Sequence, residues 1–467
     1  MTAKTPHGPQ NSTGKWILTT CILASSLSFI DGSVINVGLP AIGHALKAGA
    51  AALQWLINAY LLPLGALLLL GGAAGDRFGR RRLLIIGTAL FGAASLACAL
   101  APSLVWLLAA RAAQGVGAAI LLPNSLAILG ASFSGEAKGR AVGVWAAAGA
   151  VMGAIGPVLG GWLIDTVGWR SIFFINLPPA VGAIVLALLF VRDKVRPADA
   201  LPLDLAGGAL ATLSLGVVTW GLTMGTGPDG WSVTATSICL AGLALGGAFL
   251  WLEHRLGDRA MMPLAMFGSR TFAGLTLLTL LLYGALGALM VLVPYVLIQA
   301  AGYSGTAAGA ALLPFAALLG IASPLAGSLA AKTGPRIALS LGPLIVAVGF
   351  ALLLRVDSHA AYWSQVFPAI VTLAVGMTIT VAPLTTAVLS SVDDGHTGAA
   401  SGLNSAVARS AGMIATAVLG GVLAASGSAL ISGFHLAAIA CCIASLAASL
   451  SAWLLVSANN ETHKPRK

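Results

Sequence analysis

The sequence predicts an all-α, polytopic membrane protein with about fourteen transmembrane helices, arranged as two six-helix pseudo-symmetric bundles plus two extra central helices. Composition is the first observation, because 58% of the 467 residues are hydrophobic and only 8% are charged, whereas about a quarter of a soluble domain is charged. The second is a succession of apolar segments of about 20 residues, the length that crosses a bilayer. The third is a loop motif that recurs later in the chain. Each span is expected to be a helix, because lipid cannot hydrogen-bond an open backbone.

The apolar segments follow one another along the chain, separated by polar turns. The predicted spans lie near 16–39, 53–74, 83–101, 104–128, 141–164, 172–191, 203–224, 233–252, 271–299, 306–329, 337–354, 362–388, 398–424 and 431–456. The predicted parts are a cytoplasmic tail (1–15), an N-terminal six-helix bundle (16–192), a linker with two extra helices (193–256), a C-terminal six-helix bundle (257–456) and a cytoplasmic tail (457–467).

The net charge of +10 comes mainly from basic residues in the loops between apolar segments. This pattern is typical of cytoplasmic loops in membrane proteins, whereas a nucleic-acid-binding protein gathers basic residues on one face. With both termini in the cytoplasm, only Lys47, Arg170 and Arg355 fall in outer loops, while Arg111 and Arg409 lie within spans. We therefore expect a multi-pass, monomeric protein of the bacterial plasma membrane, in contact with the lipid bilayer and without a nucleic-acid partner.

Signals for chemistry are missing from the sequence. The five cysteines lie in apolar segments, and the seven histidines are scattered without metal-ligand spacing. We find no nucleophile–base constellation and no Walker motif, which argues against an enzyme and against ATP as the energy source. A membrane enzyme or sensor would also need a soluble domain, and the loops are too short for one. We expect no catalytic residue, no metal site and no cofactor.

A glycine- and arginine-rich loop motif occurs twice. Gly75–Arg82 reads GDRFGRRR after the second span, and 327–336 carries glycine and base at matching offsets after the tenth. Two such copies, eight spans apart, indicate two similar six-span halves with two extra spans between them, and repeated halves are typical of secondary transporters. Ala331 replaces the acid Asp76 in the second copy, so only the first copy has an acidic side chain.

Motifs in the first six spans give the chain its family resemblance. In order along the chain, they are Asp31–Pro40, Gly75–Arg82, Arg111–Gly117, Gly153–Gly161 and Trp169–Pro178. With these motifs the chain resembles the major facilitator superfamily, and within it the fourteen-helix drug:proton antiporter family. One departure is Ser171, where that family often has tryptophan.

The resemblance implies a proton-coupled antiporter that exports amphipathic drugs or antibiotics by alternating access, with the proton as coupling ion and a small molecule as substrate. The alternative is a proton-coupled or facilitated uptake permease for a vitamin or small metabolite, because the same fold serves both directions. A channel would leave the alternating-access motifs unexplained.

Asp31 is the only carboxylate deep inside a predicted span, where a charge costs roughly 2.5–3.5 kcal/mol. It lies about 12 Å from the outer end of its helix, and Arg111 about 10 Å from the outer end of the fourth span, at 1.5 Å per residue. We therefore expect Asp31 to bind and release the coupling proton, with Arg111 nearby to stabilise its charge. The alternative is a structural ion pair or hydrogen-bond anchor.

The loop after the second span is expected to act as a conformational latch. Arg80 and its basic neighbours favour the cytoplasmic side, and Gly79 permits a tight turn. The resemblance implies that Asp76, supported by Arg77, holds the two halves together in one conformation, against the positive end of a second-half helix. The alternative is a loop that sets topology only.

The fifth span carries the motif that the resemblance identifies with antiporters, Gly153, Gly156, Pro157, Gly160 and Gly161. Glycines at four-residue spacing allow close helix contact, and proline bends a helix. The functional interpretation is a sealed hinge between the halves, and the alternative is ordinary helix packing.

Polar and aromatic residues within the spans are candidates for substrate contact, although each could equally bond a neighbouring helix. They are Asn36, Asn58, Tyr60, Gln114, Asn124, Tyr295, Gln299, Asn404 and Arg409. The deep spans contain one acid, Asp31, against two bases, so we expect neutral, zwitterionic or weakly anionic substrates rather than dications.

Overall fold

The computed structural model describes residues 11–192, 204–227, 230–257, 260–392 and 397–457. Most of the predicted N-terminal tail, the polar linker 193–203 and nearly all of the predicted C-terminal tail lie outside the described residues. Within the described part every predicted span is mainly helical, as the apolar segments predict, with short breaks at 175–176, 311–312 and 418–419.

The helices follow the predicted spans closely. The first seven are α1 (Asn11–Leu46), α2 (Ala50–Phe78), α3 (Arg80–Ala99), α4 (Leu104–Ser132), α5 (Gly135–Thr166), α6 (Ser171–Phe174) and α7 (Leu177–Phe190). The extra pair is α8 (Leu205–Gly225) and α9 (Val233–Leu256). The rest are α10 (Arg270–Gln299), α11 (Gly305–Ala310), α12 (Leu313–Thr333), α13 (Pro335–Leu352), α14 (Phe367–Ser390), α15 (Thr397–Ala417), α16 (Gly420–Ala424) and α17 (Gly427–Leu455). Short helical turns lie at Leu264–Gly268, Leu353–Arg355 and Tyr362–Val366.

Among the described residues, 13 helical segments are long and apolar enough to cross a membrane. The remaining predicted span, 398–424, is also helical, but it consists of α15 and the short α16, with a break at 418–419. It is less apolar than the others because α15 carries polar residues such as Asn404, Ser405 and Arg409. The fold class is therefore as the sequence predicts.

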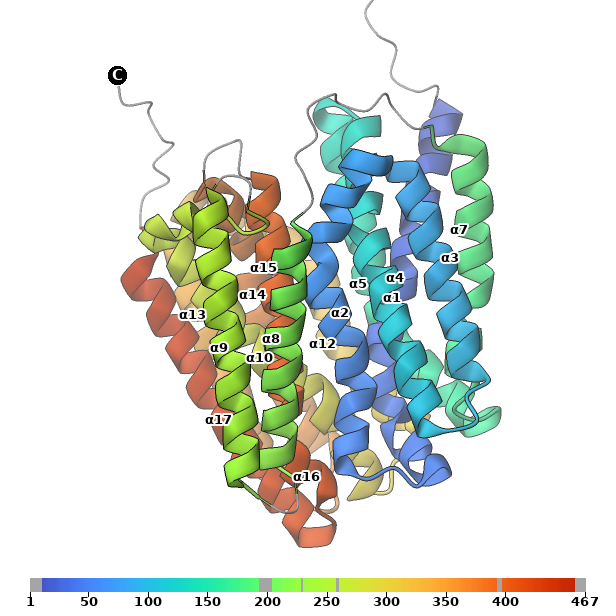
Figure 1. Ribbon diagram of the computed structural model, residues 1–467. Helices are drawn as coiled ribbons and strands as arrows, with labels where there is room; N and C mark the ends of the chain where they lie inside the picture. Colours follow the sequence, from blue (N-terminus) through green and yellow to red (C-terminus); the bar gives the residue numbers. More distant parts are fainter. Residues whose placement is uncertain (1–10, 193–203, 228–229, 258–259, 393–396, 458–467) are drawn as a thin grey trace, which may run out of the picture.

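The helices form two groups, which we call the N-terminal bundle (α1–α7) and the C-terminal bundle (α10–α17) (Figure 1). α8 and α9 pack on each other as a hairpin, and α8 touches both α2 and α15. The extra pair therefore lies beside the seam between the bundles. Across this seam α2 contacts α15, and α5 contacts α11 and α12.

Close helix packing explains much of the glycine content of the N-terminal bundle. A Cβ added at Gly71 in α2 would overlap the carbonyl group of Ala119 in α4. A Cβ added at Gly117 in α4 would lie 2.7 Å from the backbone nitrogen of Phe91 in α3. Such close approach stabilises helix pairs in lipid, where apolar burial gives little driving force.

We call the end of the molecule that carries the α3–α4 turn and the start of α11 the outer end, following the orientation predicted from the basic residues. It lies at the bottom of Figure 1, with α16. The opposite end, with the α2–α3 turn, is called the inner end.

Candidate functional site

A buried ion pair joins α1 and α4 in the middle of the N-terminal bundle. Nη1 of Arg111 donates to Oδ2 of Asp31 at 2.5 Å, and the two side chains are 0% and 2% exposed. The structure thus brings together the acid and base that helix depth placed at similar levels. An isolated charge at such a site would be energetically costly. Each of the two charges offsets the cost of burying the other.

Neutral polar side chains complete the binding of the Asp31 carboxylate. Nε2 of Gln114, one turn along α4, donates to Oδ1 of Asp31 at 2.9 Å and to Oγ of Ser95 in α3 at 2.8 Å. Nδ2 of Asn176, between α6 and α7, donates to the same Oδ1 at 3.4 Å. Donors from different helices therefore stabilise the negative charge, as a fixed polar cage in a medium of low dielectric constant does.

Arg111 is held on its other sides by α2. Its Nε donates to the backbone oxygen of Leu56 at 3.1 Å, and its guanidinium lies 4.5 Å from the centre of the Tyr60 ring. The Tyr60 hydroxyl in turn pairs with Ser28 of α1 at 2.6 Å. Nη2 of Arg111 is buried and has no hydrogen-bond partner within the described ranges. One strong donor is therefore unsatisfied in this conformation, which costs about 1–3 kcal/mol for a buried polar group.

Gln114 and Tyr60 were expected to contact substrate, and both lie in or against this network. Other candidates bond the backbone: Nδ2 of Asn124 donates to Gly71 O at 2.9 Å, and the Tyr295 hydroxyl donates to Leu423 O at 2.9 Å. Gln299 is exposed at the last residue of α10. For each of these residues, contact with substrate stays a prediction.

Asn36 and Asn58 are buried in the N-terminal bundle, at 7% and 0% exposure. Neither amide atom of Asn58 has a hydrogen-bond partner in the described part of the chain. Asn404 and Arg409, by contrast, line a cavity in the C-terminal bundle. Of the nine predicted contacts, these two are therefore the best placed for a ligand.

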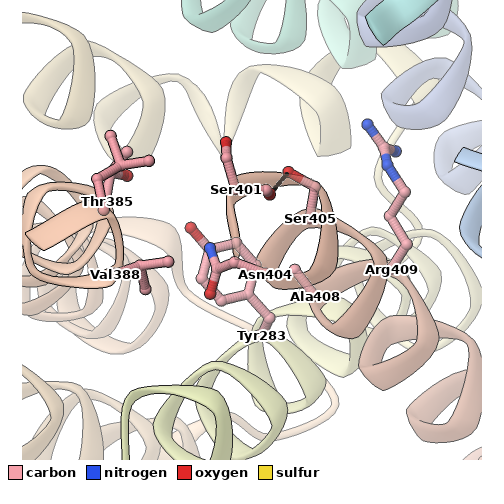
Figure 2. A pocket seen from close by; sticks show the side chains of 9 residues that line it. Tyr283, Thr385, Val388, Ser401, Asn404, Ser405, Ala408 and Arg409 are labelled. Atoms are coloured by element: carbon pink, nitrogen blue, oxygen red, sulfur yellow. Dashed lines mark hydrogen bonds between the residues drawn. The ribbon is translucent and has the colours of Figure 1, made fainter. Parts of the chain in front are cut away.

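The cavity has a volume of about 330 Å³ and is lined by residues of α10, α14 and α15 (Figure 2). Its walls combine an aromatic ring, aliphatic side chains, hydroxyls, an amide and a guanidinium. The lining residues are Tyr283, Thr385, Val388, Leu389, Ser401, Asn404, Ser405, Ala408 and Arg409. In the chain as described, His, Cys, Asp and Glu form no group of three or more that could hold a metal ion.

The glycine motif of α5 lies where the two bundles meet at the outer end. A Cβ added at Gly161 would overlap the backbone of Gly305 at the start of α11. A Cβ added at Gly309 in α11 would likewise overlap the carbonyl group of Pro157. The backbones of α5 and α11 thus touch, which closes the outer end of the seam.

Other glycines of the motif face α1. A Cβ added at Gly156 would overlap Oγ of Ser33, and one added at Gly160 would lie 2.8 Å from Val34. Gly153 faces open space, with no heavy atom within 4 Å of an added Cβ. The motif therefore packs α5 against two helices at once, and Gly153 is the member without a packing role in this conformation.

Asp165, which sequence reasoning missed, adds a polar contact to this closure. Its carboxylate accepts hydrogen bonds from the backbone nitrogens of Gly305 at 3.1 Å and Thr306 at 2.8 Å, and from the Thr306 hydroxyl at 2.6 Å. A carboxylate at a helix start satisfies free N–H groups and opposes the helix dipole. The available signal was its position four residues after Gly161, on the same face of α5.

A second outer contact joins α2 to α15. Nε2 of Gln54 donates to the backbone oxygens of Thr416 and Ala417 at 2.9 and 2.8 Å. These carbonyls lie at the end of α15, where helical hydrogen bonds stop. Gln54 therefore caps a helix of the other bundle, just as Asp165 does.

At the inner end, the predicted latch residue Asp76 interacts with another residue of the same α2–α3 motif. Asp76 pairs with Arg80 at 2.7 Å, and the two side chains are 54% and 39% exposed. Gly79 adopts φ +104° in the turn between α2 and α3, a conformation that favours glycine. Arg77 lies over the Phe78 ring. The contact of Asp76 with a helix of the second half thus stays a prediction, and it is expected in the outward-open conformation.

The family model described as Major Facilitator Superfamily matches residues 21–281 and 275–467. The chain is 34% identical over 400 residues to "Multidrug resistance protein Stp" of Mycobacterium tuberculosis, covering 85% of this chain and 73% of that protein. It is 34% identical to "Cephamycin export protein CmcT" of Amycolatopsis lactamdurans (89% and 86% covered), and 29% identical to "Methylenomycin A resistance protein" of Bacillus subtilis (98% and 97%). A solved D-xylose-proton symporter shares the fold, with TM-score 0.70, 17% identity, and 96% of this chain and 99% of that chain covered.

The contact of α5 with α11 predicts that two glycine substitutions in the same motif differ in their effect. Gly161→Ala should force the helices apart, because its Cβ would overlap Gly305, whereas Gly153→Ala should have no effect. Amide hydrogen exchange over 305–310 measures this, with about tenfold faster exchange expected in Gly161→Ala alone. Equal exchange in both variants would mean that backbone contact does not hold the outer end closed.

Loss of the Asp165 carboxylate should also open the outer end. Asp165→Ala removes every acceptor for Gly305 and Thr306, and charged caps contribute on the order of 1 kcal/mol. We expect faster exchange at those amides and a shift toward an outward-open state, read from spin-label distances across the outer end. Asp357→Asn, in an exposed outer loop, is the control and should leave both readouts unchanged. If Asp165→Ala behaves like the control, the carboxylate is not part of the closure.

Proposed function

The chain belongs to the Major Facilitator Superfamily, and on this premise we propose that it is a proton-coupled antiporter that exports amphipathic drugs or antibiotics by alternating access. The family and the names of the relatives make it a membrane transporter and not an enzyme. Export as the direction is supported by relatives named for export or for resistance.

The observation that carries the proposal is the buried Asp31–Arg111 pair. A carboxylate that is only 2% exposed in a membrane-spanning helix is energetically costly, and such a residue is expected to have a functional role. Its ionised form is held by Arg111, Gln114 and Asn176. Binding of a proton would remove the charge that holds Arg111 in place, so the network would change its arrangement when the proton arrives.

The proposed cycle couples that change to the outer closure through α1. Asp31 lies in the same turn of α1 as Ser33 and Val34, which pack against the glycines of α5. α5 in turn contacts α11 of the C-terminal bundle at the outer end. We propose that protonation of Asp31 accompanies outer opening, and that loss of the proton to the cytoplasm accompanies the outer-closed state seen here.

The remaining parts of the proposal follow from the family and the charge pattern. Both termini lie in the cytoplasm of a bacterial plasma membrane, with the basic α2–α3 loop inside. The Asp76 latch would form in the outward-open state, when the inner end is closed. The proton is the only coupling ion required, and the working unit is one chain.

The test is Asp31→Asn in inverted membrane vesicles with an acidified lumen, with methylenomycin A and a cephamycin as trial substrates. Asparagine keeps the size and can accept a hydrogen bond, but it cannot carry the proton. For the wild type, substrate added outside should drive protons out of the lumen, and the mutant should lose this flux. Asp357→Asn is the matched control and should keep it.

Two outcomes would contradict the proposal. Unchanged substrate-driven proton flux in Asp31→Asn would exclude Asp31 as the coupling group. Proton and substrate moving in the same direction in the wild type would indicate uptake by symport.

A further inference from the structure

We propose that the cavity of the C-terminal bundle binds an anionic oxygen group of the cargo through Arg409. The cargo would be an amphipathic compound with a carboxylate, or an ionised enol or phenol, beside an apolar body. This inference rests on the proposed transport function and names the charge class of its substrate.

Within the described residues, Arg409 differs from Arg111, the other arginine inside a membrane span, in having no hydrogen-bond or ion-pair partner. Arg111 pairs with Asp31, and Arg170 lies over Trp169 and bonds Ala101. Arg409 makes no ion pair and no hydrogen bond with any residue that the structure describes. It lies well inside α15, where an unpaired cation is unfavourable in a membrane. A ligand that supplies negative oxygen would remove this penalty.

The rest of the cavity wall also suits an anion, because it offers donors and no acid. The lining residues include neither Asp nor Glu. Oδ1 of Asn404 lies 2.7 Å from the Thr279 hydroxyl, which also lies 2.8 Å from the Leu275 carbonyl oxygen, and the Nδ2 group of Asn404 has no hydrogen-bond partner among the described residues. The Tyr283 hydroxyl is a further donor on the same wall (Figure 2). A cavity specialised for cations would place carboxylates here.

Apolar side chains give the cavity a second kind of surface. Val388, Leu389 and Ala408 line it together with the Tyr283 ring. Small-molecule sites are mainly apolar, with a few polar groups that fix orientation. The arrangement thus fits an amphipathic cargo, with its anionic group at Arg409 and its apolar body against these residues.

Arg409 also lies at the seam between the bundles. A Cβ added at Gly65 of α2 would be 3.5 Å from Cβ of Arg409. One turn and a half before Gly65, α2 carries Tyr60, on which Arg111 stacks. The proposed anion site is therefore separated from the proton site by one helix, so cargo bound there can influence both bundles.

The experiment compares two probes that share a ring system and differ in charge, anthracene-9-carboxylate and the neutral 9-(hydroxymethyl)anthracene. Binding to the full-length protein in lipid nanodiscs is followed by fluorescence. Arg409→Gln should weaken carboxylate binding by at least about tenfold, the loss expected for a charge-assisted hydrogen bond, and change binding of the neutral probe by less than about twofold. Arg409→Lys should retain part of the preference, because it keeps the charge and loses the planar fork.

The matched control is Arg355→Gln, which removes the same charge from an exposed position at the outer end. It should bind both probes as the wild type does. Asn404→Leu, in the same wall as Arg409, provides a second test that keeps the guanidinium, and it should also weaken the carboxylate more than the neutral probe.

The proposal is overturned if Arg409→Gln affects both probes equally or neither. It is also overturned if the wild type binds no member of a panel of aromatic carboxylates, or prefers a cationic dye such as rhodamine 6G. Binding is measured without a proton gradient, so the result is independent of coupling. Selective carboxylate binding with no substrate-driven proton flux would reject the antiport mechanism and keep the anion site.

Discussion

An ionised carboxylate inside a membrane protein must be neutralised by its surroundings, and the N-terminal bundle is organised around this requirement. Asp31 of α1 receives hydrogen bonds from Arg111 and Gln114 of α4 and from Asn176 beside α7. Ser95 of α3 binds the two amides that reach the carboxylate. Movement of any of these helices therefore changes how strongly the Asp31 carboxylate is stabilised. In turn, a change in the charge of Asp31 alters the hydrogen bonds that hold these helices together. This reciprocity is what a coupled transporter needs.

α1 links the charged centre to the closure between the bundles. Asp31 faces the network, and Ser33 and Val34 in the same turn meet Gly156 and Gly160 of α5. Because glycine leaves no side chain to absorb displacement, small shifts of α1 are passed to the α5 backbone. That backbone touches α11, where Asp165 caps the first turn. The path is a contiguous set of packed elements, which is a physical basis for coupling between sites.

The sequence predicts the parts of this system that depend on composition and depth along a helix. Apolar runs predict the spans, and the equal depth of Asp31 and Arg111 predicts that they can meet. Which way each helix is rotated depends on contacts with its neighbours, and no single sequence contains that information. The sequence therefore does not reveal that Gln114 bonds Asp31 or that Asn124 bonds the α2 backbone, and contact of either residue with substrate stays a prediction. Asp165 escaped notice because an acid near a helix end usually faces water, and its partner Thr306 is 141 residues away.

The two bundles use their intramembrane arginines differently, and the difference suggests a division of labour within a repeated fold. In the N-terminal bundle the acid and the base lie together, so Arg111 is neutralised by the protein, and in the proposed mechanism this pair binds the coupling proton. In the C-terminal bundle Arg409 borders a cavity whose described lining contains no acid, and we propose that the cargo supplies the neutralising group. The loop motif shows the same asymmetry, since Asp76 has no acidic counterpart at Ala331. A protein with both charges satisfied internally could bind a proton but would have no electrostatic means to select its cargo. In the proposed mechanism, therefore, proton binding at the paired arginine and cargo binding at the arginine beside the cavity act on separate bundles, which meet at the seam.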